Sequence, residues 1–292
     1  MLTGVVLKAF NSFYYIKHEQ GVTVCKLRGR FKQARYSLAV GDSVEYDLLD
    51  DETGIIEKIL PRQSVLKRPL VANVDQVILT FAAASPNLHP LLLDRFLVLA
   101  EYSKLKNILI CINKIELADL VLLEKTLQPY YEIGYEIVKV SAKENIGMLE
   151  LKNHLKDKIS VFAGPSGVGK STLLNAIEPG LNLATGVIST KIKRGKHTTR
   201  VAELLPLVEG GFVVDTPGFS STEFDYIQKT DLEDYFVEFR PFMDTCKYNT
   251  CIHDVEPDCS VKQAVIDKKI SQVRYDAYLN ILHEIQSKKK GF

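Results

Sequence analysis

The segment GPSGVGKS, at residues 164–171, matches the spacing G-x-x-x-x-G-K-[ST] of a phosphate-binding loop. It follows the apolar run ISVFA, and its last two residues open KSTLLNAI, a run with helical periodicity. Glycines in such a loop let backbone N–H groups face phosphate oxygens, and the helix N-terminus adds a partial positive charge. The segment therefore predicts an α/β domain in which a buried strand, a loop and a helix hold nucleotide phosphates.

The residues around this loop agree with an α/β domain. From about residue 72 to residue 218, strand-like apolar runs alternate with helical runs, which is typical of a parallel sheet wrapped by helices. We expect Lys170 to reach the β- and γ-phosphates and the Ser171 hydroxyl to bind Mg²⁺. The predicted nucleotide contacts of this segment are Gly164, Pro165, Ser166, Gly167, Val168, Gly169, Lys170, Ser171 and Thr172.

Two other regions flank the α/β part. The first sixty residues hold five short β-rich runs separated by turn signals, which predicts a small closed barrel. An OB-type barrel is the preferred form, and an SH3-like barrel is the alternative. The last sixty-odd residues are mostly helical in pattern. We therefore expect an OB-like β-barrel at 1–62, a P-loop domain at 63–225 and a mainly α-helical domain at 226–292, with a linker at Pro61–Pro69.

The run GFVVD ends in Asp215, and the sequence continues as T-P-G to Gly218. A carboxylate at a strand end, aimed at the metal beside a phosphate loop, is the second part that a nucleotide hydrolase needs. Gly218 can present its backbone N–H to the γ-phosphate. Between the two motifs lies GKHTTR, where Thr199, or else Thr198, is expected to complete the Mg²⁺ shell when the γ-phosphate is present.

Candidate base-reading residues come before the phosphate loop. Asn113, Lys114 and Glu116 follow the strand-like run NILIC, and S-A-K follows a second such run at Ser141 and Ala142. Guanine recognition needs a carboxylate for N1–H and the exocyclic amine, an Asn on the other edge, and a loop of small residues. These two elements supply such groups, so they predict a guanine site whose parts occur in an unusual order.

A metal site is predicted near the C-terminus. Cys246, Cys251, His253 and Cys259 offer three thiolates and one imidazole within fourteen residues. Four such ligands suit a closed, tetrahedral and therefore structural Zn²⁺ site. Ser260 and Gln263 have the spacing of a helix capping box directly after the last ligand. The following helix is expected to bury Val273, Ala277, Tyr278, Ile281, Leu282 and Ile285, whereas Cys25 and Cys111 are expected to be core thiols.

Taken together, the motifs G-x-x-x-x-G-K-S, H-T-T, D-T-P-G, N-K-x-[acid] and S-A-K resemble those of the translation GTPases. Their order, with the base-reading elements first, resembles that of the circularly permuted GTPases. With the N-terminal barrel and the C-terminal metal cluster, the chain is similar over its whole length to the ribosome small-subunit-dependent GTPase A family. The resemblance implies hydrolysis of GTP to GDP with Mg²⁺, one structural Zn²⁺, binding to the small ribosomal subunit and its rRNA, and a role in late subunit maturation.

Two positions depart from what such GTPases carry. Glu116 stands where the family pattern has Asp, so its carboxylate lies one methylene further out, and we expect guanine preference with some loss of affinity or discrimination. Phe219 stands where many GTPases have a glutamine that orients the attacking water. Intrinsic hydrolysis should therefore be slow, with His197 as the nearest candidate to position water and subunit binding as the expected stimulus.

The distribution of charge and the hydropathy of the chain indicate which classes of partner it can bind. The net charge is +1, but Lys26–Arg35 and Lys191–Arg200 each hold five basic residues and no acid, which suits RNA phosphates better than a uniform surface would. No apolar run approaches 18 residues, so we expect a monomeric cytoplasmic protein without a membrane partner.

Two other functions share parts of this pattern. A small-molecule kinase would use the same phosphate loop but needs no guanine reader, and N-K-I-E with S-A-K disfavours it. A nucleotide-dependent RNA-binding scaffold would need no catalytic groups, and the intact Lys170, Ser171 and Asp215 disfavour that function.

Overall fold

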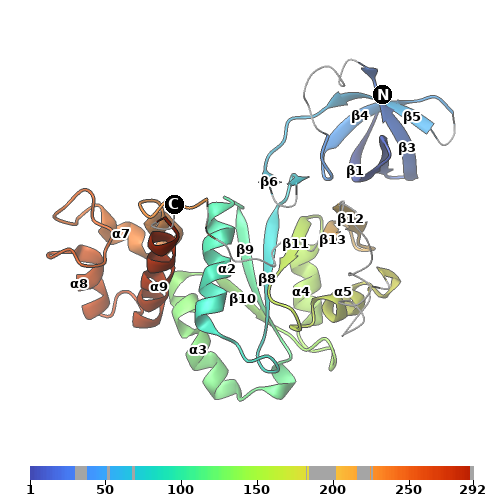
Figure 1. Ribbon diagram of the computed structural model, residues 1–292. Coiled ribbons are helices and arrows are strands. Elements are labelled where there is room, and N and C mark those ends of the chain that lie inside the picture. Colours follow the sequence, from blue (N-terminus) through green and yellow to red (C-terminus); the bar gives the residue numbers. More distant parts are fainter. Residues whose placement is uncertain are drawn as a thin grey trace.

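The computed structural model describes residues 1–29, 38–50, 53–67, 70–181, 183, 202–215, 224 and 226–289. Figure 1 shows a β-barrel at the N-terminal end, a sheet flanked by helices in the middle, and a helical part at the C-terminal end. This arrangement confirms the predicted fold class of a barrel, an α/β domain and a helical C-terminal region.

The N-terminal barrel is closed and has five strands in the order β1-β2-β3-β5-β4. Neighbouring strands are antiparallel except for β3 and β5, which are parallel. Alternate residues point inward, and Val6, Ile16, Val44, Tyr46 and Ile56 fill the interior together with Cys25. The strands are β1 (Leu2–Phe10), β2 (Phe13–His18), β3 (Gly21–Leu27), β4 (Ser43–Leu48) and β5 (Thr53–Ile59).

The segment predicted to be a linker, Pro61–Pro69, contains secondary structure, so that prediction was wrong in part. Strand β6 (Val65–Lys67) pairs antiparallel with β7 (Leu70–Ala72). Arg62 donates two hydrogen bonds to the fully buried carboxylate of Asp42, at 2.6 and 2.8 Å, and Ala72 N–H donates to Val40 O at 2.8 Å. These contacts hold the segment against the barrel.

The central sheet has six strands in the order β10-β9-β8-β11-β13-β12. The first five are parallel, as predicted, and β12 runs antiparallel to β13. Strand β12 was not predicted from the sequence; it is a short edge strand that pairs with β13, the next strand along the chain. The bounds are β8 (Gln76–Ala82), β9 (Asn107–Asn113), β10 (Glu136–Lys139), β11 (Ile159–Ala163), β12 (Glu203–Pro206) and β13 (Phe212–Asp215).

Helices cover both faces of this sheet (Figure 1). Because side chains alternate along β8, Val77, Leu79 and Phe81 pack with α2 and α3, whereas Ile78 packs with α4 and α5. The barrel contributes to the first of these cores through Leu7, and Lys8 pairs with Glu203 of β12 at 3.2 Å. The helices are α2 (Pro90–Tyr102), α3 (Leu120–Ile133), α4 (Met148–Leu155) and α5 (Lys170–Ile177), with short 3-10 turns η1 (Ile115–Leu117) and η2 (Pro179–Leu181).

The C-terminal helical part packs on α2 through the last helix, α9, and Val98 and Leu99 of α2 belong to its core. Arg274 of α9 is fully buried and donates to Asp94 of α2 at 2.7 Å and to Glu238 at 2.7 and 3.1 Å. The elements are η3 (Leu232–Tyr235), η4 (Val237–Phe239), α7 (Arg240–Met243), α8 (Ser260–Ile266) and α9 (Gln272–Lys289).

Two predictions about these helices need correction. Cys259, not Ser260, is the N-cap of α8, because its sulfur accepts from Lys262 N–H, whereas the Ser260 hydroxyl donates to Thr245 O. On α9, Val273 is 48% exposed, since the neighbouring Arg274 takes the buried position facing α2. The other expected positions are buried: Ala277, Tyr278, Ile281, Leu282 and Ile285.

The remaining sequence expectations about the core agree with the structure. Cys25 and Cys111 are both fully buried, and burial raises the pKa of the Cys25 thiol to about 11 and that of Cys111 to about 12. Within the described ranges, none of the helices has the length and apolar character needed to cross a membrane.

Candidate nucleotide and metal sites

The predicted nucleotide elements that the structure describes lie at one edge of the central sheet. The strands β9, β8, β11 and β13 are parallel neighbours, so their carboxyl ends lie side by side. Asn113 is the last residue of β9, the phosphate loop follows β11, and Asp215 is the last residue of β13. In open parallel sheets this edge is where ligands bind.

The phosphate loop connects β11 to α5 and comes very close to β8. Gly164 has a φ of +139°, and a Cβ atom there would lie 2.0 Å from the backbone oxygen of Thr80. Only glycine fits this approach. The Lys170 ammonium donates to Gly164 O at 2.7 Å and to Pro165 O at 2.8 Å, so it lies inside the curve of the loop. Ser171 and Thr172 form the first turn of α5.

Base-reading and phosphate-binding elements touch directly. The Asn113 side chain donates from Nδ2 to Val168 O at 3.0 Å and accepts at Oδ1 from Ala142 N–H at 3.2 Å. Lys114 donates from Nζ to Gly167 O at 2.8 Å. Asn113 is 2% exposed. One buried amide therefore bridges all three motifs, N-K-I-E, S-A-K and the phosphate loop.

Glu116 and Ser141, two other predicted base-reading residues, lie on either side of Asn113 in exposure: one is exposed and the other is buried. Glu116 lies in η1 and is exposed, so its carboxylate faces solvent. Ser141 is fully buried, and its hydroxyl accepts from Glu144 N–H at 3.0 Å, which shapes the S-A-K loop. The Ser141 backbone also forms an isolated bridge with Ile146.

Several predicted residues lie outside the described ranges. These are the switch-loop residues His197, Thr198 and Thr199, together with Gly218 and Phe219 beyond β13. The basic run Lys191–Arg200 lies there too. Of Asp215, the structure gives the place of its backbone at the end of β13.

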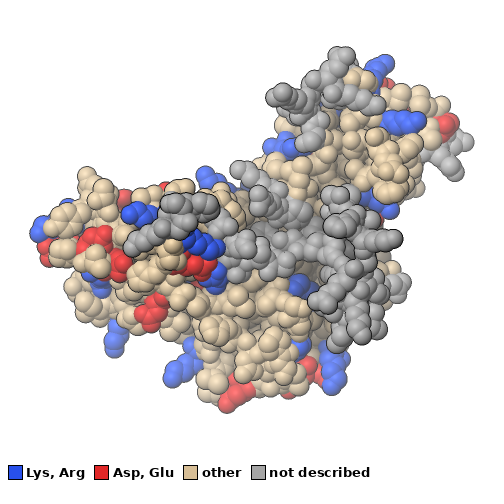
Figure 2. Space-filling model, viewed as in Figure 1, with Lys and Arg blue, Asp and Glu red and all other residues tan. Residues whose placement is uncertain are grey.

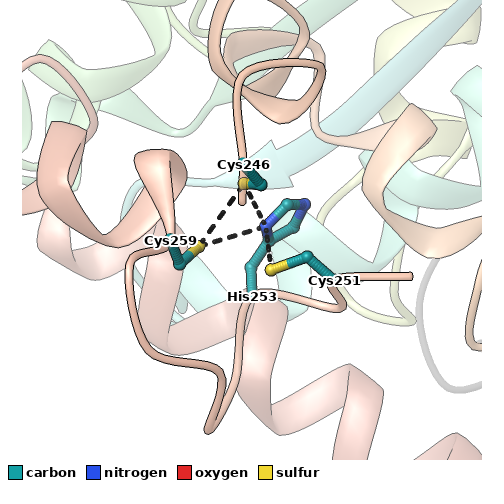
Figure 3. Close-up of side chains that lie close together, drawn as sticks. All are labelled: Cys246, Cys251, His253 and Cys259. Atoms are coloured by element: carbon teal, nitrogen blue, oxygen red, sulfur yellow. Dashed lines mark hydrogen bonds between the residues drawn. The ribbon is translucent and has the colours of Figure 1, made fainter. Parts of the chain in front are cut away.

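The predicted metal ligands form a compact cluster, shown in Figure 3. The four potential ligand atoms lie within 4.8 Å of one another. His253 Nδ1 is 3.6 Å from Cys246 Sγ, 3.4 Å from Cys251 Sγ and 3.3 Å from Cys259 Sγ. The Sγ atoms of Cys246 and Cys259 are 3.8 Å apart. The imidazole nitrogen thus faces three sulfurs.

The three distances from His253 Nδ1 to sulfur and the distance between Cys246 Sγ and Cys259 Sγ fit a tetrahedral zinc ion. Ideal Zn–S and Zn–N bonds at tetrahedral angles place S and N about 3.5 Å apart and two sulfurs about 3.8 Å apart. Three of the four ligands are buried, and all come from one short stretch of chain. With three thiolates and an imidazole the set is complete, so the fit is to a closed structural site.

Two residues that contact these sites were missed in the sequence. Ser85, after β8, accepts a hydrogen bond from Lys114 Nζ through its carbonyl oxygen. Glu233, in η3, lies against the His253 ring. Ser85 could have been found, because it follows a buried strand parallel to those that carry the motifs. Glu233 belongs to no motif, so its role depends on tertiary structure alone.

Two family models match the chain. The model described as RsgA GTPase matches residues 59–225, and the one described as RsgA N-terminal domain matches residues 3–56. A curated relative from Caldanaerobacter subterraneus subsp. tengcongensis, "Small ribosomal subunit biogenesis GTPase RsgA", is 45% identical over 99% of this chain and 97% of its own length. The relative of the same name from Clostridium kluyveri is 46% identical over 99% of this chain and 100% of its own length.

Solved structures agree with these matches. The crystal structure of YjeQ from Thermotoga maritima is similar with a TM-score of 0.85 and 41% identity, covering 97% of this chain and 98% of that one. The structure of YloQ, a circularly permuted GTPase, is similar with a TM-score of 0.83 and 37% identity, covering 99% and 96%. The motif order, the strand-end site and these full-length matches lead to one conclusion: the chain belongs to the RsgA family of GTPases, enzymes that hydrolyse GTP and are circularly permuted.

Proposed function

We propose that this GTPase binds the small ribosomal subunit and assists its late maturation, with low intrinsic GTP hydrolysis that the subunit stimulates. The printed names of the full-length relatives support the subunit as partner. A factor acting on that subunit works in the cytoplasm, and we expect it to act as a monomer. The proposed division of labour follows the segments 1–62, 63–225 and 226–292, for RNA binding, GTP hydrolysis and zinc binding.

The observation that carries the GTP assignment is the Asn113 bridge. Asn113 contacts both Val168 of the phosphate loop and Ala142 of the S-A-K loop. A base reader is useful only if it is held at a fixed distance from the phosphates, and this amide provides that connection. Guanine would lie against Lys114, with Glu116 accepting from its N1–H and exocyclic amine.

The proposed phosphate chemistry follows from the sheet edge. Lys170 would turn from the loop carbonyls to the β- and γ-phosphates, where its charge offsets that of the transferred group. Ser171 and Thr199 would hold Mg²⁺, with Asp215 orienting the metal shell, and bound Mg²⁺ supplies further charge neutralisation. Gly218 N–H would donate to the γ-phosphate.

The proposed active site has no glutamine to orient the attacking water. Phe219 cannot hydrogen-bond water, so the isolated protein lacks the glutamine that many GTPases use. We propose that His197 fills this place once the subunit orders the active geometry. Full subunit-stimulated turnover in His197→Ala would exclude that role.

The barrel surface supports binding to RNA. Phe10 is 61% exposed and Phe13 is 38% exposed, and Lys26 lies over the Phe13 ring at 5.0 Å. Exposed aromatic rings beside basic side chains are typical of surfaces on which unpaired bases stack. On the C-terminal part, Figure 2 shows acidic and basic side chains interspersed, consistent with ion pairs such as Lys247–Asp258 at 2.6 Å.

Co-sedimentation with purified small subunits tests the partner directly. The chain loaded with a non-hydrolysable GTP analogue should pellet with small subunits and should be released with GDP. Large subunits serve as the control. Equal pelleting in both nucleotide states, or with both subunits, would contradict the proposal.

A further inference from the structure

The His253 ring has a partner at each of its two nitrogens. Nδ1 faces the three cysteine sulfurs, and Nε2 lies 2.5 Å from Oε2 of Glu233. The His253 side chain is 1% exposed, whereas that of Glu233 is 24% exposed. Both ring edges are therefore used, and water has almost no access to the imidazole.

This arrangement determines which nitrogen can bind a metal. A neutral imidazole ligand binds through one nitrogen and carries its proton on the other. A carboxylate at Nε2 accepts that proton in a hydrogen bond, which leaves the Nδ1 lone pair directed at the sulfurs. A carboxylate in this position also makes the imidazole a better electron donor and restrains rotation of the ring.

We propose that Glu233 is a positioning residue of the metal centre: it accepts the Nε2–H of His253 and so presents Nδ1 to the ion. The proposal rests on the zinc assignment and adds a residue from outside the Cys246–Cys259 segment. Glu233 lies in η3, in the segment between the D-T-P-G turn and the first cysteine. The metal centre is thereby tied to the part of the chain that leaves the switch region.

Residues on both sides of the Glu233–His253 contact are held in place by other elements. Leu232, next to Glu233, is fully buried in the core that α2 and α9 share. On the other side, Tyr275 of α9 donates to His253 O and Tyr278 donates to Ile252 O, both at 2.7 Å. The backbone of His253 is thus held by α9, and its ring is held by η3.

The test compares metal affinity in full-length variants, measured by competition with a chromophoric chelator for Zn²⁺. Glu233→Ala removes the acceptor and should weaken Zn²⁺ binding about 10- to 100-fold. Glu233→Gln keeps an acceptor oxygen and should recover much of this loss. Asp234→Asn, which neutralises the exposed carboxylate next in the chain, is the matched control and should bind zinc like the unmodified protein.

Co²⁺ substitution supplies a readout that a purely structural contact would not change. The visible d–d spectrum of the Co²⁺-loaded protein should shift and weaken in Glu233→Ala and should be retained in Glu233→Gln. The proposal is overturned if Glu233→Ala matches Asp234→Asn in both affinity and spectrum. It is also overturned if the Gln and Ala variants lose affinity equally with unchanged spectra, because the effect would then be that of charge alone.

Discussion

The metal centre and the nucleotide site are assembled in opposite ways. The four candidate metal ligands come from fourteen consecutive residues, and Glu233 contacts one of them, His253, from another element. The nucleotide residues come from the ends of four parallel strands, spread from Asn113 to Asp215.

The contrast explains why the chain order of the GTPase motifs can change. A site made of strand ends depends on which strands are neighbours in the sheet, not on which comes first along the chain. Asn113 reaches Val168 across the sheet edge whatever the connection between their strands. A site built from one short segment has no such freedom, because the spacing of its ligands along the chain determines where they lie in space.

The largest effect is expected from loss of a metal ligand. Cys259→Ser removes both a thiolate and the cap of α8. Structural zinc contributes about 10–16 kcal/mol in small zinc domains, which matches the whole stability of many domains. We expect loss of bound zinc and unfolding of residues 240–289, measured by metal content and limited proteolysis, while GTP binding persists.

Cys111→Ala is the control, because it removes a buried thiol that lies far from the cluster in sequence and belongs to the sheet core. It should keep full zinc content. Loss of GTP binding in Cys259→Ser would show that the two sites are not independent units.

The next largest effect is expected where the C-terminal helical part packs on α2. Arg274→Met leaves Asp94 and Glu238 without their buried cation, and breaking such a pair costs about 3–5 kcal/mol. Denaturant unfolding should show this loss while the zinc content stays unchanged. Arg240→Met provides a comparison, since Arg240 pairs with Glu101 at 3.6 Å and is 56% exposed, so it should cost at most about 1 kcal/mol. Equal losses of unfolding free energy in the two variants would show that the buried Arg274 ion pairs do not stabilise this contact.

A smaller and more local effect is expected in the phosphate loop. Gly164→Ala places a methyl group 2.0 Å from Thr80 O and forces alanine to a φ of +139°. Strain of this kind costs about 1–3 kcal/mol, so GTP affinity measured by calorimetry should fall about 10- to 100-fold. Gly180→Ala, where the nearest atom to the new Cβ is a side-chain oxygen at 3.8 Å, should leave affinity unchanged. Unchanged GTP affinity in Gly164→Ala would contradict the assignment of this loop as the phosphate-binding site.

The smallest effect is expected at the base reader. Glu116→Asp restores the carboxylate distance of the family pattern, and one better-placed hydrogen-bonded pair is worth about 0.5–1.5 kcal/mol. GTP binding in competition with ATP should improve about two- to tenfold. Weaker GTP binding in this variant would mean that the site is adapted to glutamate, and equal affinity of the unmodified protein for ATP and GTP would remove the guanine assignment.

The sequence predicted those parts of the structure whose signals are local. The phosphate loop needs glycines at set positions, and a zinc cluster needs its ligands close together, so local spacing predicted the roles of Gly164 and Cys246, the latter with support from the family resemblance. Strand and helix alternation likewise predicted the parallel sheet, because period and length differ clearly between the two kinds of run.

The parts that escaped prediction depend on partners distant in sequence. Strand β12 is four residues long and exists because β13 is beside it. Arg274 was not singled out in the sequence, and it is fully buried because Asp94 and Glu238 pair with it from other elements. Ser260 had the spacing of a cap, but the cysteine before it already occupied that position.

The most direct test of the account is GTP hydrolysis with and without purified small ribosomal subunits. The intrinsic rate should be low, and small subunits should raise it by at least tenfold, with ATP hydrolysed poorly in both conditions. Lys170→Ala should abolish the stimulated rate without changing the zinc content. A rate unaffected by small subunits, or raised equally by large subunits, would contradict the central claim.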